Sequence, residues 1–227
     1  QKIILEEPSN LNAHFNLGIL YYRNALFDEA VREFRKVLDI NPNDSEAYYN
    51  LGNVFNKKNL FDDAIDSYKK ATAINSNDAG IFHNLGNAYA GKGMIDDAIS
   101  SYKKAIEINP NLAESHKSIA YLYKKKGQTT ESIQSFEKAA KSNSKDIPML
   151  LDLASTYESN GSQDRAILTY KRILSIDPNH KDTKNRLAML CNNKGVSLAL
   201  LGKSDEAISA YKEALQNKED FKEVYNN

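Results

Sequence analysis

Residues 79–112 read AGIFHNLGNAYAGKGMIDDAISSYKKAIEINPNL, and this 34-residue pattern recurs along the chain. Its Leu-Gly pair, at the seventh and eighth places, returns at 34-residue intervals in Gly18, Gly52 and Gly86. An alanine stands twelve residues after each of these glycines, and an aromatic residue follows four residues later: Ala30 with Phe34, Ala64 with Tyr68, and Ala98 with Tyr102. Self-similarity at a fixed period of this length predicts a stack of similar supersecondary units.

The period divides the chain into six full repeats, whose bounds are 11–44, 45–78, 79–112, 113–146, 147–180 and 188–221. Residues 1–10 match the last ten places of a repeat and residues 222–227 match the first six, so we expect partial repeats at both ends of a segment cut from a longer array. The sixth repeat begins seven residues late. Because seven residues make nearly two helical turns, we expect residues 181–187 to lengthen its first helix. A protruding helix that docks a partner or a neighbouring domain is the alternative.

Each repeat carries two separate helical patterns. In the first repeat, Leu17, Gly18 and Tyr21 share one face of a helix, and Ala30 and Phe34 share a face of a second helix. Residues that tolerate left-handed backbone predict the turn between the helices: Asn59, Gly93, Gly127, Gly161 and Gly202. Acidic residues open the second helices beside the free N–H groups of the first turn: Asp28, Asp62, Asp96 and Asp205. Prolines follow the second helices and prevent their continuation: Pro42, Pro110 and Pro178.

The pattern resembles the tetratricopeptide repeat, whose signature places Leu-Gly, an aromatic residue, Ala, a second aromatic residue and Pro at the same intervals. Four residues stand where that family often has Trp: His14, Tyr48, Phe82 and His116. The resemblance covers essentially the whole chain. It implies an all-α fold, a right-handed α-solenoid of six tandem helix-turn-helix units.

The composition excludes several classes of protein. Thirty Lys and Arg balance thirty Asp and Glu, which argues against a protein that coats nucleic acid or another polyanion. No stretch approaches the roughly 20 consecutive apolar residues that span a bilayer, so we expect no membrane partner. The single cysteine, Cys191, excludes an internal disulfide framework and a multi-cysteine zinc site, and we expect it to be a small buried hydrophobic residue.

No group of residues in the sequence predicts catalysis, a metal site or a cofactor. The stretch from Gly86 to Gly93 resembles a phosphate-binding loop, but it lacks the final Ser or Thr and a preceding strand. The four histidines follow no metal-ligand spacing. His14 and His116 fall in a position between helices that predicts an imidazole with apolar surroundings.

In the tetratricopeptide geometry the first helices line a concave groove, and here a column of asparagines follows them. Asn16, Asn50 and Asn84 occupy the sixth place of the first three repeats, and Asn53 and Asn87 occupy the ninth. A carboxamide both donates and accepts hydrogen bonds, so such a column can hold the backbone of an extended peptide whatever its sequence. The arrangement is similar to the asparagine ladder of the O-GlcNAc transferase superhelix, and we expect it to contribute little to folding. The alternative is a structural role, since the family often has Asn before Leu-Gly.

Further candidate residues flank the column on the same side of the first helices: Tyr49, His83 and Lys117 at the fifth place, Arg23 and Lys57 at the thirteenth, and Ser118 and Tyr121 in the fourth repeat. Another branch of the family clamps chaperone tails with Lys and Asn at the fifth and ninth places of one repeat. Phe15 and Ile19 occupy those places in the first repeat, which argues against that ligand.

These observations predict a protein–protein interaction scaffold that binds an extended peptide or a partner helix in its concave groove and has no catalysis of its own. A second hypothesis is that the chain is the substrate-recruiting arm of a larger enzyme, such as a glycosyltransferase resembling O-GlcNAc transferase. A third hypothesis is self-association through the open ends of the array. The sequence starts with Gln, as a fragment of a longer chain would, and no targeting segment can be read from it, so it predicts no compartment and a cytoplasmic location is only the default.

Overall fold

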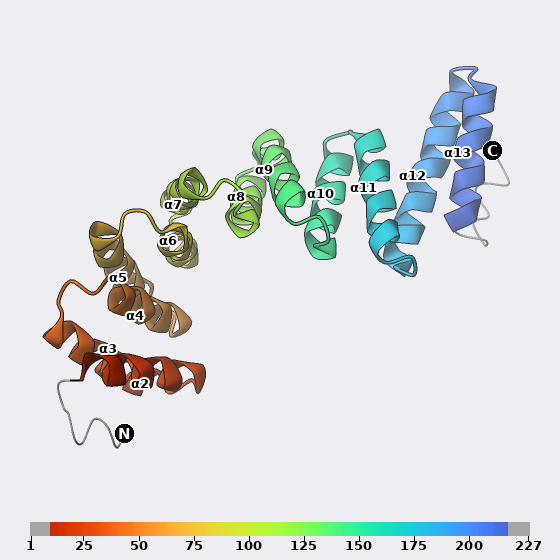
Figure 1. Ribbon diagram of the computed structural model, residues 1–227. Helices are drawn as coiled ribbons and strands as arrows, with labels where there is room; N and C mark the ends of the chain where they lie inside the picture. Colours follow the sequence, from red (N-terminus) through yellow and green to blue (C-terminus); the bar gives the residue numbers. More distant parts are fainter. Residues whose placement is uncertain (1–9, 218–227) are drawn as a thin grey trace. The chain divides into compact units, whose positions relative to one another are not determined.

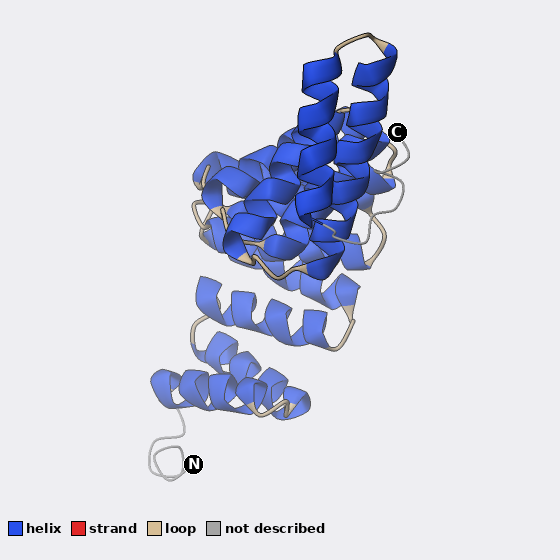
Figure 2. Ribbon diagram, turned by 90° about the vertical axis from the view of Figure 1, so that its right-hand side faces the viewer, coloured by secondary structure: helices blue, strands red, loops and turns tan. Residues whose placement is uncertain are grey.

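The computed structural model describes residues 10–217, and all regular structure in that range is α-helical (Figure 1 and Figure 2). The helices are α2 (Leu11–Arg23), α3 (Phe27–Ile40), α4 (Ser45–Lys57), α5 (Phe61–Ile74), α6 (Ala79–Gly91), α7 (Ile95–Ile108), α8 (Ala113–Lys125), α9 (Thr129–Ser142), α10 (Ile147–Ser159), α11 (Gln163–Ile176), α12 (Lys181–Leu200) and α13 (Ser204–Asn217). They follow one another as tandem helix-turn-helix pairs. The chain is therefore an all-α solenoid, as the sequence predicts.

The two helices of a repeat have nearly constant lengths. Each first helix has 13 residues, apart from α12 with 20, and each second helix has 14. The helices of a repeat pack against each other, as α4 does with α5 and α6 does with α7. A second helix also contacts the first helix of the following repeat, as α5 does with α6. The second repeat thus buries apolar residues against both of its neighbours, through α4 on α3 and through α5 on α6.

Contacts divide the chain into two compact parts, Gln1–Leu122 and Tyr123–Asn227, with the boundary inside α8. We call them the N-terminal part and the C-terminal part, and each is described by itself. The partial repeats expected at residues 1–10 and 222–227 lie outside the described residues, apart from Asn10. The side chain of Asn10 accepts a hydrogen bond from the backbone of Ala13 and so caps α2.

The repeat glycine permits a close approach between the two helices of a pair. A Cβ atom on Gly52 would lie 2.6 Å from the ring of Tyr68, and a Cβ atom on Gly86 would lie 2.6 Å from the ring of Tyr102. Both rings are buried, and so is Ala98 on α7. The recurring Gly, Ala and aromatic residues of the sequence are therefore the packing interface within each pair.

The turn between the helices of a pair uses left-handed backbone. This conformation is confirmed at Asn59, where φ is 59°, at Gly93, where φ is 83°, and at the three later turn glycines. The corresponding residue of the first repeat is Ala25, which adopts the same conformation with φ of 59°. An alanine is strained there, because its Cβ atom crowds the following carbonyl group.

The acidic residues at the second helices lie in the first turn, as the sequence predicts, and two of them have a further role. Helices α3 and α5 begin one residue before Asp28 and Asp62, and no side chain caps either helix. Both carboxylates lie in the first turn and form ion pairs of 2.5 Å with Lys58 and Lys92 of the following repeat. They join successive repeats as well as complementing the helix macrodipole.

The N-terminal 14 residues of α12, up to Lys194, dock on the preceding repeat. Lys194 forms an ion pair of 2.6 Å with Asp164, which precedes it by 30 residues. The same spacing joins Asp28 to Lys58. The N-terminal 14 residues of α12 therefore occupy the ordinary register of a first helix, counted from residue 181.

The second half of α12 pairs with α13. Gly195 faces the ring of Tyr211, and a Cβ atom on this glycine would lie 2.5 Å from the ring, as in the earlier repeats. The pairing with α13 is thus counted from residue 188, and the two extra turns extend α12 past the region that docks on α11. At its end Leu200 and the following Leu201 are 83% and 72% exposed.

Candidate functional site

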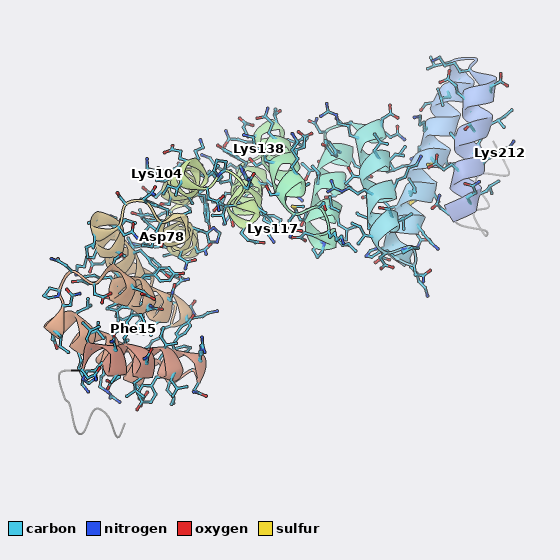
Figure 3. All side chains as sticks on the ribbon, in the orientation of Figure 1. Phe15, Asp78, Lys104, Lys117, Lys138 and Lys212 are labelled. Carbon is cyan, nitrogen blue, oxygen red and sulfur yellow. The ribbon has the colours of Figure 1, made fainter. Side chains whose placement is uncertain are left out.

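The first helices of the N-terminal part carry a layered set of side chains along one face. In each of the first three repeats the residue at the fifth place lies against the aromatic residue at the twenty-fourth. The ring centroids are 5.8 Å apart for Phe15 (labelled in Figure 3) and Phe34, and 6.1 Å apart for Tyr49 and Tyr68. For His83 and Tyr102 the separation is 5.3 Å. We call the fifth, sixth and ninth places of α2, α4 and α6 the amide face.

Hydrogen bonds connect the asparagines of the amide face to these tyrosines. Tyr68 donates its hydroxyl hydrogen to Asn53 Oδ1 at 2.7 Å. Asn84 Nδ2, on the next first helix, donates to the same oxygen and to Tyr49 Oη, both at 3.0 Å. Two successive repeats are thereby joined through neutral side chains.

The hydrogen-bonded chain continues into the third and fourth repeats. Asn87 Nδ2 donates to Asn84 Oδ1 at 3.3 Å, and Tyr102 donates to Asn87 Oδ1 at 2.7 Å. Burial raises the pKa of Tyr102, and a hydrogen bond from Ser118 partly offsets that rise. The expectation that the asparagine column contributes little to folding is revised for Asn53, Asn84 and Asn87, because their amides hold neighbouring helices together.

The first repeat lacks this polar layer in both of its members. It has Phe34 in place of the tyrosine and Ile19 in place of the ninth-place asparagine, and both pack in the same apolar cluster. A tyrosine hydroxyl there would have no amide to bond, and an amide would have no hydroxyl. The pairing of Tyr with Asn and of Phe with Ile is visible in the sequence, but the sequence analysis did not connect these places.

Among the remaining predicted residues, Asn16, Arg23 and Lys57 are exposed, and Tyr121 is 38% exposed. Asn50 is half-buried and donates to the backbone oxygen of Glu46 at 2.8 Å. Lys117 forms an ion pair of 3.0 Å with Glu114. His83 Nδ1 lies 2.8 Å from Ser115 Oγ. Burial holds the pKa of His83 below its usual value, so the ring is neutral at pH 7. The structure therefore connects Tyr49, Asn53, Asn84, Asn87 and Ser118, and leaves Asn16, Arg23 and Lys57 at the surface.

The prediction that His14 has apolar surroundings is wrong. His14 is 2% exposed, and its Nδ1 lies 2.6 Å from Oε2 of the buried Glu33. Burial opposes ionisation of Glu33, but hydrogen bonds from His14 and Lys36 hold the pKa of this carboxyl below its usual value. The next four repeats have Ser or Thr at that place, as in Ser67, whose hydroxyl bonds the backbone of its own helix. Glu33, at a place where the next four repeats have Ser or Thr, is the feature of the sequence that could have predicted this pair.

The described part of the chain gives little support to a metal site, a membrane-spanning helix or a phosphate-binding loop. Within residues 10–217 no group of three or more His, Cys, Asp and Glu side chains could hold a metal ion, and no helix is long and apolar enough to cross a membrane. Gly86 lies within a helix that packs on Tyr102, so the stretch that resembles a phosphate-binding loop is not a loop. Cys191 is buried, and burial raises the pKa of its thiol to about 12.

Models of the TPR repeat, or tetratricopeptide repeat, match residues 27–59, 52–93, 79–112, 101–134, 147–180 and 189–221. These matches fall on the tandem helix pairs described above. The chain belongs to the tetratricopeptide repeat (TPR) family. TPR proteins generally mediate protein–protein interactions.

Solved structures of TPR proteins are similar to this one. MamA is 26% identical, with a TM-score of 0.68, and the match covers 74% of this chain and 92% of MamA. TTC0263, a TPR protein from Thermus thermophilus, is 27% identical, with a TM-score of 0.54 and coverage of 79% and 98%. YrrB, described as a TPR protein with an unusual peptide-binding site, is 21% identical over 85% and 96%, with a TM-score of 0.60, and supports the fold alone. A search of curated proteins found no match.

Proposed function

We propose that this TPR array is a protein–protein interaction scaffold, without catalysis of its own, that binds an extended peptide segment along the amide face. The observation that carries the proposal is the chain of amides and hydroxyls across α4, α6 and α8. Its asparagines are half-buried, so each is held in one orientation by its neighbours and still reaches solvent. A fixed row of donors and acceptors suits the regularly spaced N–H and C=O groups of an extended peptide.

Two asparagines on the same side of the first helices are free to contribute directly. Asn16 is exposed, and Asn50 uses only its amide nitrogen, in a bond to the backbone of its own helix. Neither belongs to the chain that joins the repeats. Their removal therefore separates binding from folding, whereas removal of Asn84 or Asn87 would disturb both.

The test uses a partner captured from a cell extract with the wild-type chain, identified, and then titrated by calorimetry. The double variant Asn16→Ala with Asn50→Ala should weaken its binding about fivefold or more, since each amide–backbone pair contributes roughly 0.5–1.5 kcal/mol. The matched control is Lys70→Ala with Lys104→Ala, because both lysines are exposed on second helices and bind acids of their own helix. Equal affinity of the double variant and the wild type would contradict the proposal.

Self-association is a second candidate function, and one observation favours it. Ile65 and Ile99 occupy the twenty-first place of their repeats and are 8% and 6% exposed, whereas Ile208 at the same place is 51% exposed. An apolar side chain that no described residue covers suits contact with a second copy of the chain. Light scattering would show a mass that rises with concentration in the wild type and not in Ile208→Asp.

A further inference from the structure

The interface between two successive repeats has two halves, one on each repeat. On the second helix of the first repeat, Val31 at the twenty-first place belongs to a buried apolar cluster. On the first helix of the second repeat, Leu51 and Val54 at the seventh and tenth places complete the same cluster. None of the three is more than 9% exposed. The twenty-first place of a second helix therefore packs against the seventh and tenth places of the first helix that follows it.

The first and last described helices, α2 and α13 (Figure 1), each carry one of these halves. Helix α2 has Leu17 and Leu20 at the seventh and tenth places; Leu17 is half-buried and Leu20 is 54% exposed. Helix α13 has Ile208 at the twenty-first place, and this residue is 51% exposed. No described residue covers Leu20 or Ile208 as Val54 and Val31 are covered. The two helices thus present the two complementary halves of one kind of interface.

An ion pair marks the register of the internal interfaces. Lys58, at the fourteenth place of the second repeat, pairs with Asp28, at the eighteenth place of the first. In the sixth repeat the acid at the eighteenth place is Asp205, which is exposed and forms no ion pair with any described residue. The fourteenth place of the first repeat is Asn24, which is exposed and carries no charge. The two halves therefore match in their apolar residues and lack only the cation, so their contact should be weaker than an internal interface.

We infer that copies of this chain associate head to tail, with Leu17 and Leu20 of α2 on one copy packed against Ile208 of α13 on another. The partner is a second copy because the contact continues the interface that the chain already forms between α3 and α4, and both halves lie on one polypeptide. Such a contact is heterologous, so a pair retains one free face of each kind and can add further copies. The inference rests on self-association as the second candidate function and specifies the two faces that meet.

The test is sedimentation equilibrium of two variants, each of which alters one face. Leu20→Asp and Ile208→Asp should each weaken association at least about tenfold, because each puts a charge into an apolar contact. An equimolar mixture of the two should still form a pair, since the intact α13 of one variant meets the intact α2 of the other. The wild type should exceed the mass of two copies at high concentration, whereas the mixture should not.

The matched control is Leu168→Asp, which makes the same change on α11 at a residue that is 66% exposed and should alter association less than about twofold. If Leu20→Asp associates as strongly as the wild type and Ile208→Asp does not, the contact is a symmetric one through α13; self-association then stands and the inference is overturned. A wild type that stays monomeric up to about 1 mM would overturn both and leave peptide binding along the amide face as the function. If Leu20→Asp does not fold by circular dichroism, Leu20→Lys replaces it, because Lys is the better helix former.

A gain of affinity tests the register of the contact. Asn24→Lys supplies the missing cation opposite Asp205, as Lys58 does opposite Asp28. At low ionic strength this variant should associate about twofold to fivefold more tightly than the wild type, the range for an exposed ion pair. The gain should disappear at high salt, and Asn24→Gln, which adds no charge, should show none. Unchanged affinity of Asn24→Lys would overturn the inferred register.

Discussion

The tyrosine at the twenty-fourth place is used differently in the two parts of the molecule. In the third repeat Tyr102 donates to the neutral amide of Asn87, whereas in the fifth repeat Tyr170 donates to Glu158 Oε1 at 2.6 Å. The side chain of Glu158 is 12% exposed, and its carboxylate is also bound by Nε and Nη2 of Arg186. Its acceptors are thus occupied by the chain itself.

The comparison shows that the tyrosine at one scaffold position can belong either to a closed or to an open set of hydrogen bonds. The charged group of Tyr170, Glu158 and Arg186 is closed, because Tyr170 and Arg186 of the same part bind both oxygens of the Glu158 carboxylate. The neutral row of the N-terminal part is open, because it ends in the free donors of Tyr49 and Asn53. Ligand binding is therefore expected in the N-terminal part.

The largest expected effect concerns the glycine that faces the tyrosine. Gly86→Ala would place a methyl group 2.6 Å from the ring of Tyr102, which is 2% exposed and cannot move away. We expect the free energy of unfolding to fall by about 3 kcal/mol, at the upper end for overpacking. Urea denaturation followed by circular dichroism measures it.

The fifth repeat supplies the matched control, since it has Ala154 at the same place and Tyr170 bonded one helical turn further along, to Glu158. Ala154→Gly should reduce stability by only about 1 kcal/mol, the difference in helix propensity. If Gly86→Ala is as stable as the wild type, the close approach is not a packing constraint.

A smaller effect distinguishes the charged group from the neutral row. Tyr170→Phe removes a hydrogen bond to a carboxylate and should lower the free energy of unfolding by about 2 kcal/mol, whereas Tyr102→Phe removes one to an amide and should lower it by about 1 kcal/mol. Both changes keep the buried ring. Urea denaturation of the two variants tests the order, and a larger loss in Tyr102→Phe would show that the neutral row is the stronger network.

The buried pair of the first repeat predicts a pH effect. Hydrogen bonds from His14 and Lys36 hold the pKa of Glu33 below 4.5 in the folded chain, so the ionised carboxyl stabilises the fold above that pH. This contribution, about 1 kcal/mol for such a hydrogen bond, is lost as the pH falls through the folded pKa. The difference in melting temperature between the wild type and Glu33→Gln should shrink below pH 4.5. A constant difference from pH 7 to pH 3 would argue against ionisation of Glu33 as its source.

The smallest expected effect is a gain in stability. Ala25→Gly relieves left-handed backbone with φ of 59°, and should raise the free energy of unfolding by about 0.5–1 kcal/mol after the entropy of glycine is counted. Gly93→Ala, at the same place of the third repeat, should lower it by a similar amount. Thermal melting measures both, and a loss of stability in Ala25→Gly would show that the turn is not strained.

The helices and their turns could be predicted because each depends on residues close in sequence. Gly93 and Asn59 end helices through their own backbone freedom, and Gly86 with Tyr102 repeats at a fixed spacing. The sequence predicts which residues belong to the candidate site, but not which of them are hydrogen-bonded to one another. That Asn84 bonds Asn53 rather than solvent depends on the distance between two first helices, which the sequence does not contain.

Other features escaped prediction for related reasons. The place of His14 in the repeat predicts apolar neighbours. That prediction fails because Glu33, which is exceptional at its own place, lies across the helix pair. The sequence does not predict which residues of α12 dock on α11, because the extra length alone does not indicate whether the additional turns contact α11 or α13. The ion pair between Asp164 and Lys194 reveals it.

The seven-residue insertion in helix α12 displaces the residues that follow it by a fixed distance along the helix axis. Seven residues at about 100° each turn a helix through about 700°, only ~20° short of two full rotations, and advance it by about 10 Å. The insertion therefore slides α13 along the axis while returning the apolar stripe to nearly the same angle. Three or four extra residues would swing that stripe by roughly 40–60° and expose it. A TPR array can accordingly be re-spaced in heptad steps without redesigning its core, which gives engineers a discrete way to move one helix of a repeat relative to the units before it.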